Sequence, residues 1–520
     1  MKYAVTAGQM KAHENYIMET LGLDAILLME RAALFTAEVL NECAEKEDRV
    51  LVVCGTGNNG GDGLALARIL TETGYEADVL LIGDENKRSA LNIRQEKMLF
   101  CRQKFRTLTD TKKSGKEYSV IVDAILGIGC TRDLSGEIRE TVEWMNAQNA
   151  YKIAMDIPTG ICSDTGCVRG AAFAADITVT FGLPKQGLYL GDGKKYAGGL
   201  KYDSCGMVYP DFWQKMAEKK SDKTFVIEKT DVRRGLKRDS GGNKATFGKI
   251  GVIAGSKNIA GAAELAVEAA FRSGGGYVRL CTHENNKNSI MQTIPETVLQ
   301  LYGDRTEDVA GQVDAVLAFA DVICCGPGLG TSEIAKEILN TLLQRITADK
   351  TLILDADALN LIAREHEPAE VFASLECDII LTPHVLEFSR LSKLPVEEIK
   401  ADKVEIARAY AKKHGVILVL KDAQTVIADS GGNVCISPRG NDGMAVAGSG
   451  DVLSGVLAGI CGQSDDPYTA ACLGVYIHGM AGDKAKKKLG AHSMMPTDMI
   501  RELKKCMKKL GKEANEHEAV

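Results

Sequence analysis

The feature of this sequence that most constrains its fold is the repeated alternation of short apolar runs with glycine-rich turns and helix-like segments. Examples are VLVVCG at 50–55, YSVIVDAILG at 118–127, YKIAMDIPTG at 151–160 and VICCGPGLG at 322–330. Apolar strands that alternate with helices are typical of a parallel sheet covered by helices on both faces. The sequence therefore predicts an α/β protein.

The chain is long enough for more than one domain. A single hydrophobic core rarely extends beyond about 250–300 residues, and this chain has 520. A charged stretch with weak periodicity and a terminal Gly-Gly pair occupies about 214–240, and a second α/β series follows it. We expect a domain at 1–215, a connection with a short strand at 216–240, a second domain at 241–505 and a charged tail at 506–520.

Composition excludes several classes of protein. The net charge of −7 disfavours nucleic acid as the main ligand, since duplex binding needs a basic surface. No apolar run reaches the roughly 18 residues of a membrane span, and the N-terminus lacks the apolar core of a signal peptide. The fifteen cysteines form no CxxC pair, which favours free thiols in a reducing compartment. We expect a cytoplasmic homo-oligomer with no nucleic-acid or membrane partner.

Three strand ends in the first half carry polar residues: CGTGNNGGDG at 54–63, DAILGIGCTRD at 123–133 and DIPTG at 156–160. Ligands of open parallel sheets bind outside such ends. Asn59, Asp123 and Thr159 offer only oxygen ligands, which suits a hard cation, and free amides at 127–133 could receive a phosphate. Asp156 could act as a base, or merely form an Asx turn, and the 54–63 segment could be an ordinary capped turn.

The segments TAGQMKAHE, LMERAA, CGTGNNGGDG, DAILGIG and DIPTG resemble the NAD(P)H-hydrate epimerase domain over roughly residues 1–215. The resemblance implies a Rossmann-like fold that interconverts the R and S epimers of hydrated NADH and NADPH. It implies a potassium ion held by Asn59, Asp123 and Thr159, with Asp156 at the reacting end. The hydrate contacts that it implies are Asn58, Asn59, Gly60, Gly61, Asp62, Gly127, Ile128, Gly129, Cys130, Thr131, Arg132, Asp133 and Asp156.

In the second half, GMAVAGSGDVLSGVLAGI at 443–460 is the strongest chemical signal. Gly448 and Gly450 free backbone amides where an apolar helix is expected to begin, at about Asp451. Such amides stabilise a developing anion. A carboxylate there could take a proton from a hydroxyl that is being phosphorylated, or it could simply cap the helix. His384 and Lys421 each follow a predicted strand, and each could be a ligand contact or an ordinary structural or surface residue.

This second series resembles the ribokinase-like superfamily, and within it the ADP- or ATP-dependent NAD(P)H-hydrate dehydratases, over roughly residues 226–505. The motifs are FGKIGVIAGSKNIAGAAELAVEAAFRSGGGYVRL, GPGLG, TPHVLEF and AGSGDVLSGVLAG. The resemblance implies that the nucleotide, with Mg²⁺, phosphorylates the C6 hydroxyl of the S hydrate, with Asp451 as base. It implies hydrate contacts at Ala262, Gly330, His384 and Asp451, and nucleotide contacts at Lys421, Asp422, Ala423, Gln424, Thr425, Gly448 and Gly450.

The chain departs from these family patterns at a few positions. Asp133 stands where an uncharged residue is common, Asp422 where a glycine is common, and Lys244-Ala245-Thr246 and Asn258-Ile259 replace other usual pairs. None removes a catalytic group, but Asp422 leaves the choice between ADP and ATP open; the motif containing His384 is more like the ADP-using branch. Two alternatives to a bifunctional repair enzyme are a kinase of a vitamin alcohol, and a non-catalytic nucleotide-binding module in the first half.

Overall fold

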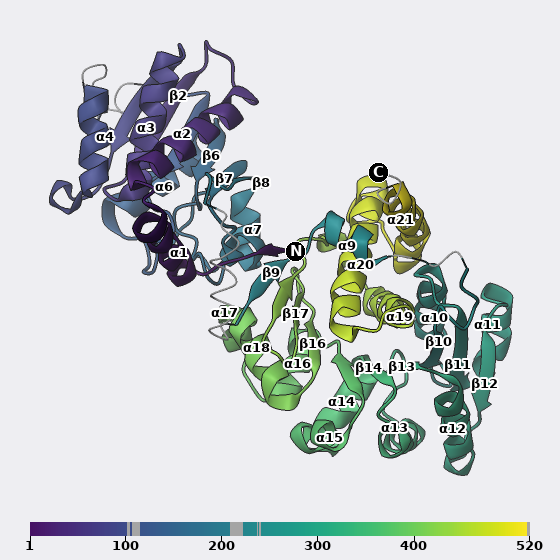
Figure 1. Cartoon of the computed structure of the whole chain (residues 1–520). Coiled ribbons are helices and arrows are strands. Elements are labelled where there is room, and N and C mark those ends of the chain that lie inside the picture. Colours follow the sequence, from purple (N-terminus) through teal and green to yellow (C-terminus); the bar gives the residue numbers. More distant parts are fainter. Residues whose placement is uncertain (101–104, 107–114, 208–221, 237, 239–240, 517–520) are drawn as a thin grey trace. The chain divides into compact units, whose positions relative to one another are not determined.

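The computed structural model describes residues 1–100, 105–106, 115–207, 222–236, 238 and 241–516. The chain forms two compact units, each with its own sheet (Figure 1). One comprises residues 3–221, and the other comprises residues 222–520 together with Met1 and Lys2. The domain boundaries expected from the sequence stay predictions.

The N-terminal unit is built on a seven-stranded sheet in the order β4-β3-β2-β5-β6-β7-β8, with parallel pairing throughout. The order reverses between β2 and β5, and open parallel sheets bind ligands at the carboxyl ends beside such a reversal. The expected Rossmann-like parallel sheet is thus confirmed. Its strands are β2 (Arg49–Cys54), β3 (Glu76–Leu81), β4 (Phe105–Arg106), β5 (Val120–Ala124), β6 (Tyr151–Met155), β7 (Ile177–Phe181) and β8 (Gly199–Asp203).

Helices cover both faces of this sheet. Along β2, Val50 and Val52 pack in one core cluster with α2 and α3, while Leu51 and Val53 pack in another with α6. Both sets of side chains are fully buried, which explains the unbroken apolar run in the sequence. The helices are α1 (Ala7–Leu21), α2 (Ala25–Asn41), α3 (Asn58–Glu72), α4 (Ala90–Phe100), α6 (Gly136–Ala147) and α7 (Gly191–Ala197).

Helix α3 begins earlier than the sequence suggests. The sequence after the glycine-rich turn predicts a helix from about Gly63 to Thr73, but the helix starts at Asn58, with Gly57 as its N-cap. The glycines of this turn permit close packing rather than a left-handed backbone. A Cβ atom at Gly60 would lie 1.9 Å from the carbonyl oxygen of Gly55, and one at Gly63 would lie 2.5 Å from the Cβ of Ala124. The polar residues at 58–62 are therefore the first turn of a helix and not a loop.

The C-terminal unit has an eleven-stranded sheet in the order β1-β9-β18-β17-β16-β15-β14-β13-β10-β11-β12. Strands β10 to β16 pair in parallel, and β16, β17 and β18 pair antiparallel. The run GVILVLKDAQTVIAD at 415–429 predicts a hairpin, and the antiparallel pairing of β16 with β17 confirms it. The order reverses between β10 and β13. The strands are β1 (Lys2–Tyr3), β9 (Thr224–Val226), β10 (Lys249–Ile253), β11 (Tyr277–His283), β12 (Val298–Tyr302), β13 (Val322–Cys325), β14 (Thr351–Leu354), β15 (Asp378–Leu381), β16 (Ile417–Leu420), β17 (Val426–Ala428) and β18 (Val434–Ile436).

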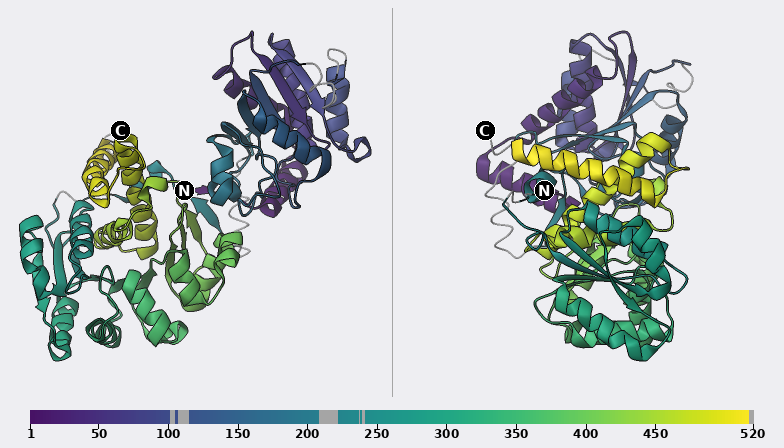
Figure 2. Two further views of the ribbon diagram at one scale, coloured as in Figure 1. Left: turned by 180° about the vertical axis from the view of Figure 1, so that it is seen from behind. Right: turned by 90° about the vertical axis from the view of Figure 1, so that its right-hand side faces the viewer.

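Helices lie on both sides of this second sheet (Figure 2), and one large core cluster joins α10, α19, α20 and α21 to it. Helix α19 packs so closely on α10 that a Cβ atom at Gly455 would lie only 2.1 Å from the carbonyl oxygen of Ala266. The helices are α9 (Lys229–Gly235), α10 (Gly261–Arg272), α11 (Lys287–Thr293), α12 (Val309–Phe319), α13 (Glu333–Arg345), α14 (Ala356–Glu365), α15 (Pro368–Ser374), α16 (Val385–Ser392), α17 (Val396–Ala401), α18 (Lys403–His414), α19 (Ser449–Cys461), α20 (Pro467–Leu489) and α21 (Pro496–Glu516).

Two segments outside the expected domains have regular structure. The short strand expected in the connection is β9, whereas residues 216–221 lie outside the described part of the chain. Residues 506–516, expected as a charged tail, continue helix α21, and Cys506 and Leu510 are buried in the core. The reason is that the charged residues of this segment are interspersed with apolar ones at helical spacing.

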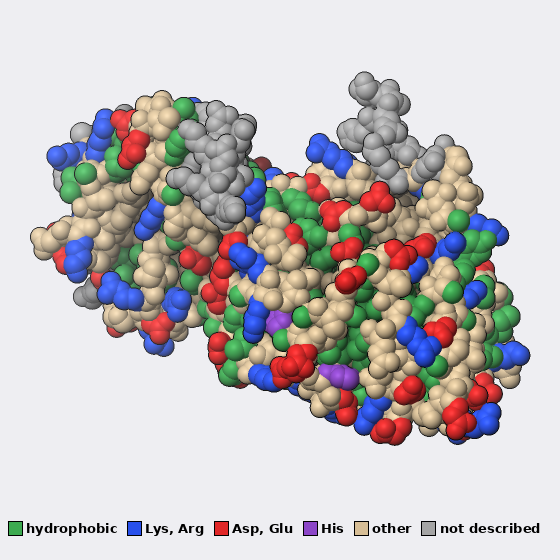
Figure 3. All heavy atoms as spheres, turned by 60° about the horizontal axis from the view of Figure 1, so that its bottom comes forward, with side chains coloured by type: hydrophobic (Ala, Val, Ile, Leu, Met, Phe, Trp, Pro, Cys, Tyr) green, Lys and Arg blue, Asp and Glu red, His purple; other side chains and the backbone are tan. Residues whose placement is uncertain are grey.

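Among the described residues, no helix is long and apolar enough to cross a membrane. Figure 3 shows Lys and Arg side chains interspersed with Asp and Glu over the face in view, without a large field of one sign.

Candidate active sites

In the N-terminal unit, the ends of β5 and β6 meet through Asp123 and Thr159. The Asp123 carboxylate is fully buried. Its Oδ1 accepts hydrogen bonds from the Thr159 hydroxyl at 2.7 Å and the Ile125 amide at 3.1 Å, and its Oδ2 accepts one from the Thr159 amide at 2.7 Å. Burial raises the pKa of Asp123 to about 6, although these hydrogen bonds act in the opposite direction.

Asn59, in the first turn of α3, contacts the carboxyl end of β6. Its Nδ2 donates to the Met155 carbonyl at 3.4 Å. Its Oδ1 is buried and has no hydrogen-bond partner within the described part of the chain. Buried carbonyl oxygens of this kind are almost always satisfied. An unsatisfied amide oxygen, a hydroxyl and a carboxylate form a donor set that fits a potassium ion, since hard cations take oxygen ligands.

Asp156 ends strand β6 in a strained conformation, with φ at 68°. Its carboxylate pairs with the ammonium of Lys185, whose side chain is only 2% exposed. Lys185 also donates to the Phe181 carbonyl at 2.6 Å and to the Thr180 hydroxyl at 3.2 Å. Since the carboxylate is directed to Lys185 and not back to its own turn, the structure does not favour the reading of Asp156 as a simple Asx turn. Backbone strain in a residue of this kind is typical of functional sites.

The 127–133 turn lies close to the side chains of Asp156 and Asn59. A Cβ atom at Gly127 would lie 2.8 Å from Oδ2 of Asp156 and 3.5 Å from Cγ of Asn59. The start of the 127–133 turn therefore lies against both side chains. Farther along this turn, Cys130 is buried, whereas Gly129, Thr131, Arg132 and Asp133 are exposed.

Two more carboxyl groups face this ion pair. Burial raises the pKa of Asp62 well above its ordinary value, and the charges of Asp156 and Glu14 add to that effect. Burial likewise raises the pKa of Glu14, on helix α1, against the lowering influence of Lys185. Three carboxyl groups therefore surround a single buried lysine. Asp62 was expected in the site, while Glu14 and Lys185 were not.

In the C-terminal unit, Asp451 lies in the first turn of α19. The N-cap is Gly448, with φ at 95°, and no side chain caps the helix, so capping is not the role of Asp451. Burial raises the pKa of Asp451 to about 6, and the nearby charge of Asp355 adds to this while Lys421 opposes it. A carboxylate with this pKa is still ionised at neutral pH, yet it is basic enough to accept a proton.

An ion pair between Asp355 and Lys421 lies next to Asp451 at this site. Asp355 ends strand β14 and is 1% exposed; its Oδ1 accepts from the Lys421 ammonium at 2.7 Å and its Oδ2 from the Ser454 hydroxyl at 2.6 Å. The pair joins β14, β16 and α19. A Cβ at Gly450 would lie 3.4 Å from Nζ of Lys421, so Lys421 lies beneath the first turn of α19. Sequence reasoning missed Asp355; the signal was its place after the apolar run TLIL.

His384 caps helix α16. Its Nδ1 accepts from the Glu387 amide at 3.1 Å, and the Glu387 carboxylate accepts from the His384 amide at 2.8 Å. His384 therefore has the structural role that was one of the alternatives. Its ring remains half exposed. The His384 backbone also forms a parallel bridge with Lys421, which places it beside the site.

Ala262 and Gly330 lie beside the order reversal between β10 and β13. A Cβ at Gly328 would lie 2.7 Å from the Cβ of Ala262, so the turn after β13 touches the start of α10. The Gly330 amide donates to Oδ2 of Asp357 at 2.8 Å. Gly330 has φ at 77°, a conformation that favours glycine. The other residues expected to contact the nucleotide lie in the 421–425 loop, between β16 and β17.

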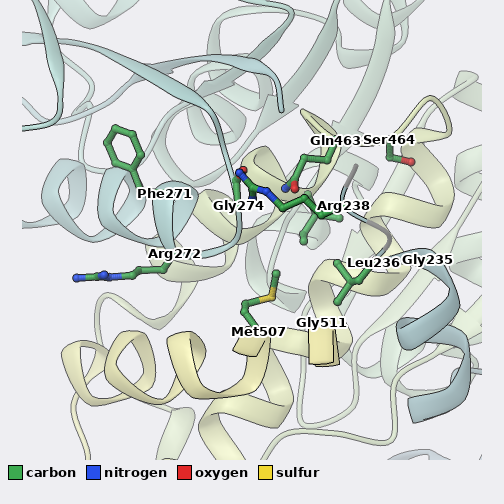
Figure 4. Close-up of a pocket in the computed structure, with 11 residues that line it drawn as sticks. Gly235, Leu236, Arg238, Phe271, Arg272, Gly274, Gln463, Ser464, Met507 and Gly511 are labelled. Atoms are coloured by element: carbon green, nitrogen blue, oxygen red, sulfur yellow. The ribbon is translucent and has the colours of Figure 1, made fainter. Parts of the chain in front are cut away.

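A pocket of about 260 Å³ lies elsewhere in this unit (Figure 4). It is lined by residues at the C-terminal ends of α10 and α19, among them Phe271, Arg272 and Gln463. Asp451 lies at the opposite, N-terminal end of α19. None of the residues expected in either site lines this pocket.

Models of two protein families match the chain: YjeF-related protein N-terminus over residues 25–187, and NAD(P)H-hydrate dehydratase over residues 250–505. The chain is 33% identical over 519 residues to the bifunctional NAD(P)H-hydrate repair enzyme Nnr of Moorella thermoacetica, covering 96% of this chain and 95% of that one. It is 32% identical to the protein of the same name from Escherichia coli, covering 96% and 93%.

Among solved structures, the ADP/ATP-dependent NAD(P)H-hydrate dehydratase of Bacillus subtilis, co-crystallised with ATP and Mg²⁺, is 32% identical to this chain. That match covers 55% of this chain and 98% of the other, with a TM-score of 0.48. The similarity to the full-length relatives extends across both units. The chain therefore belongs to the family of bifunctional NAD(P)H-hydrate repair enzymes.

Proposed function

We propose that this protein repairs hydrated NADH and NADPH. The N-terminal unit interconverts the R and S hydrates, and the C-terminal unit dehydrates the S form with ADP or ATP through a phosphorylated C6 hydroxyl. The observation that carries the proposal is Asp451, a buried carboxylate with its pKa raised to about 6, at the amide-rich start of α19. That position suits a base beside a phosphoryl-transfer site.

Dehydration proceeds in two steps. Asp451 takes the proton of the C6 hydroxyl while that oxygen attacks the terminal phosphorus of the nucleotide, so that a C6–O–P bond forms and the bond to the leaving nucleotide breaks. The backbone amides of Gly448 and Gly450 stabilise the charge of the transferred group. The ring nitrogen then expels phosphate from C6, and loss of a C5 proton restores the dihydronicotinamide.

Magnesium enters this site with the nucleotide. Among the described residues, no group of three His, Cys, Asp or Glu side chains could form a metal cage. Mg²⁺ commonly binds through one or two carboxylates plus the phosphates of a nucleotide, and Asp357 and Glu387 are acidic side chains whose charges reach Asp451. Bound Mg²⁺ would neutralise charge on the phosphates.

Epimerisation requires the C6 oxygen to leave and return on the other face of the ring. Asp62, whose pKa is raised by burial, can donate a proton to the leaving oxygen. Asp156, ion-paired with Lys185, can accept a proton from the returning water. Two carboxyl groups in contrasting environments are the arrangement that acid–base catalysis needs. The amides of the 127–133 turn would receive a phosphate of the hydrate.

Potassium would be held by Asn59, Asp123 and Thr159, and would supply a fixed positive charge in this pocket. The unsatisfied Oδ1 of Asn59 is the observation that favours it. The cytoplasmic location and the homo-oligomeric state stay predictions.

An assay with mixed hydrate epimers tests the proposal. With ADP or ATP and Mg²⁺, the protein should restore the absorbance of the reduced nicotinamide completely. Rapid restoration of only the S fraction would remove the epimerase activity from the proposal. No restoration with either nucleotide would overturn the dehydratase. A stable phosphorylated product from a vitamin alcohol would support the kinase alternative.

A further inference from the structure

The loop at 421–425, which the proposed function assigns to the nucleotide, carries an aspartate where the resembled family commonly has glycine. An aspartate in such a loop is unfavourable by itself because its charge repels the phosphates. In the structure the Asp422 carboxylate is held by another residue of the protein. Its Oδ2 accepts a hydrogen bond from the ammonium of Lys403 at 2.7 Å.

Lys403 is the first residue of α18, and its side chain is only 5% exposed. A buried ammonium is costly unless it is paired and hydrogen-bonded. Besides Asp422, Nζ of Lys403 donates to the carbonyl of Gln424 at 3.1 Å. One buried side chain therefore holds two positions of the loop, and Gln424 is itself 6% exposed.

The charges around Asp422 favour its ionised form. Burial raises the pKa of Asp422, but the charge and hydrogen bond of Lys403 outweigh burial, and the Ala423 amide and Lys400 add to the lowering. Burial lowers the pKa of Lys403, with Lys400 adding to this effect and Asp422 opposing it. The two groups thus form a charged pair, and its negative member is neutralised from the protein side.

We propose that Lys403 and Asp422 are positioning residues for the nucleotide: the pair fixes the 421–425 loop in its binding conformation and keeps the Asp422 charge away from the phosphates. The inference rests on the proposed function, because that function assigns the loop to the nucleotide. Lys403 contacts neither the nucleotide nor the hydrate in this scheme. It acts only through the loop.

The test is a double-mutant comparison. Lys403→Met leaves Asp422 without its partner and should weaken ADP binding by about tenfold, measured calorimetrically without hydrate, with little change in the KM for the hydrate. The loss should be larger for ATP, which carries more negative charge, and should shrink at high salt. Combining Lys403→Met with Asp422→Gly should restore binding to within about threefold of wild type, because the unpaired charge is gone.

Lys413→Met is the matched control, since it removes an exposed lysine from the same helix and should leave nucleotide affinity unchanged. If Lys403→Met does not fold, Lys403→Gln replaces it in the same cycle. An unchanged affinity in the single variant, or no recovery in the double variant, would overturn the proposal. Failure of the proposed function is seen separately, as wild-type protein that binds ADP but restores no reduced nicotinamide.

Discussion

Asp451 determines how the dehydration step should depend on pH. Its pKa is raised to about 6, mainly by burial and then by the charge of Asp355. A base acts only when deprotonated, so the active fraction falls as the pH drops through that value. We expect kcat/KM for the S hydrate to be level above about pH 7 and to fall nearly tenfold per unit below about pH 6. Initial rates at constant ionic strength measure this.

Removal of this base gives the matching control. Asp451→Asn keeps the shape of the side chain but cannot accept the proton, so dehydration should fall at least about a hundredfold while epimerisation persists. If the residual activity of Asp451→Asn still falls in the same way below about pH 6, then another group causes the pH dependence.

Lys185 is the corresponding residue in the N-terminal unit. Lys185→Met removes the partner of Asp156 and leaves a carboxylate without its ion pair in a site that excludes most water. We expect kcat for epimerisation to fall at least about tenfold, with dehydration of pure S hydrate unchanged. The rate at which the R epimer is consumed measures the effect. Lys195→Met, at an exposed position in the same unit, should change neither activity.

The residues that could be predicted from sequence are those whose position alone is informative. Asp123 and Asp156 follow apolar runs directly, so their location at the sheet edge needed no knowledge of their partners. Lys185 and Asp355 could not be assigned a role in this way. Lys185 is one of many lysines in the sequence, and Lys421, the partner of Asp355, is 66 residues away in sequence. Their roles arise from burial and pairing, which only the tertiary structure reveals.

At the scale of elements, the carboxyl ends of β5 and β6 and the first turn of α3 form the potassium site that we propose. If K⁺ is bound there, the folded state should be stabilised by mass action. A tenfold excess over the dissociation constant corresponds to about 1.4 kcal/mol, or about 3–6 °C in the unfolding temperature of a unit of this size. We expect this shift with KCl but not with LiCl at equal ionic strength, by calorimetry. Asp123→Asn should abolish it, and an equal shift with both salts would contradict a specific site.

The close packing of α19 on α10 also has a testable consequence. Gly455 lies against the backbone of Ala266, so Gly455→Val forces the two helices apart. Overpacking of this kind costs about 1–3 kcal/mol or more, and it would displace the turn that carries Asp451. We expect a lower unfolding temperature and a loss of dehydration, with epimerisation unaffected. Gly511→Ala, where a Cβ meets nothing within 4 Å, is the control.

Helix beginnings were the part of the elements that sequence reasoning located least well. The starts of α3 and α19 both precede the expected positions, at Asn58 and Ser449. In each case the glycines suggested a loop. At α19, Gly448 takes a left-handed φ of 95° at the N-cap, whereas at α3 Gly60 and Gly63 are needed for close approach to Gly55 and Ala124. That requirement depends on the neighbour and is invisible in a local pattern.

At the scale of the whole molecule, both units use the same device at the carboxyl edge of a parallel sheet: a buried lysine–aspartate pair beside a carboxyl group whose pKa is raised by burial. In one unit these are Lys185, Asp156 and Asp62; in the other they are Lys421, Asp355 and Asp451. Hydration of a reduced nicotinamide yields both epimers, and the proposed dehydratase uses one. Two activities in one chain therefore allow complete repair.

Because each unit has its own core and contains all the residues of the site that we propose for it, the two activities should also work in separate molecules. Asp156→Ala protein should restore reduced nicotinamide rapidly from the S fraction of a mixed-epimer sample and then slow sharply. Addition of Asp451→Asn protein, which retains only epimerisation, should carry the reaction to completion, because the R hydrate can diffuse to the intact epimerase and return as S. The absorbance of the reduced nicotinamide follows both phases. If the mixture stops where Asp156→Ala stops alone, although each variant keeps its remaining activity, then the hydrate does not pass through solution and the sites depend on being in one chain.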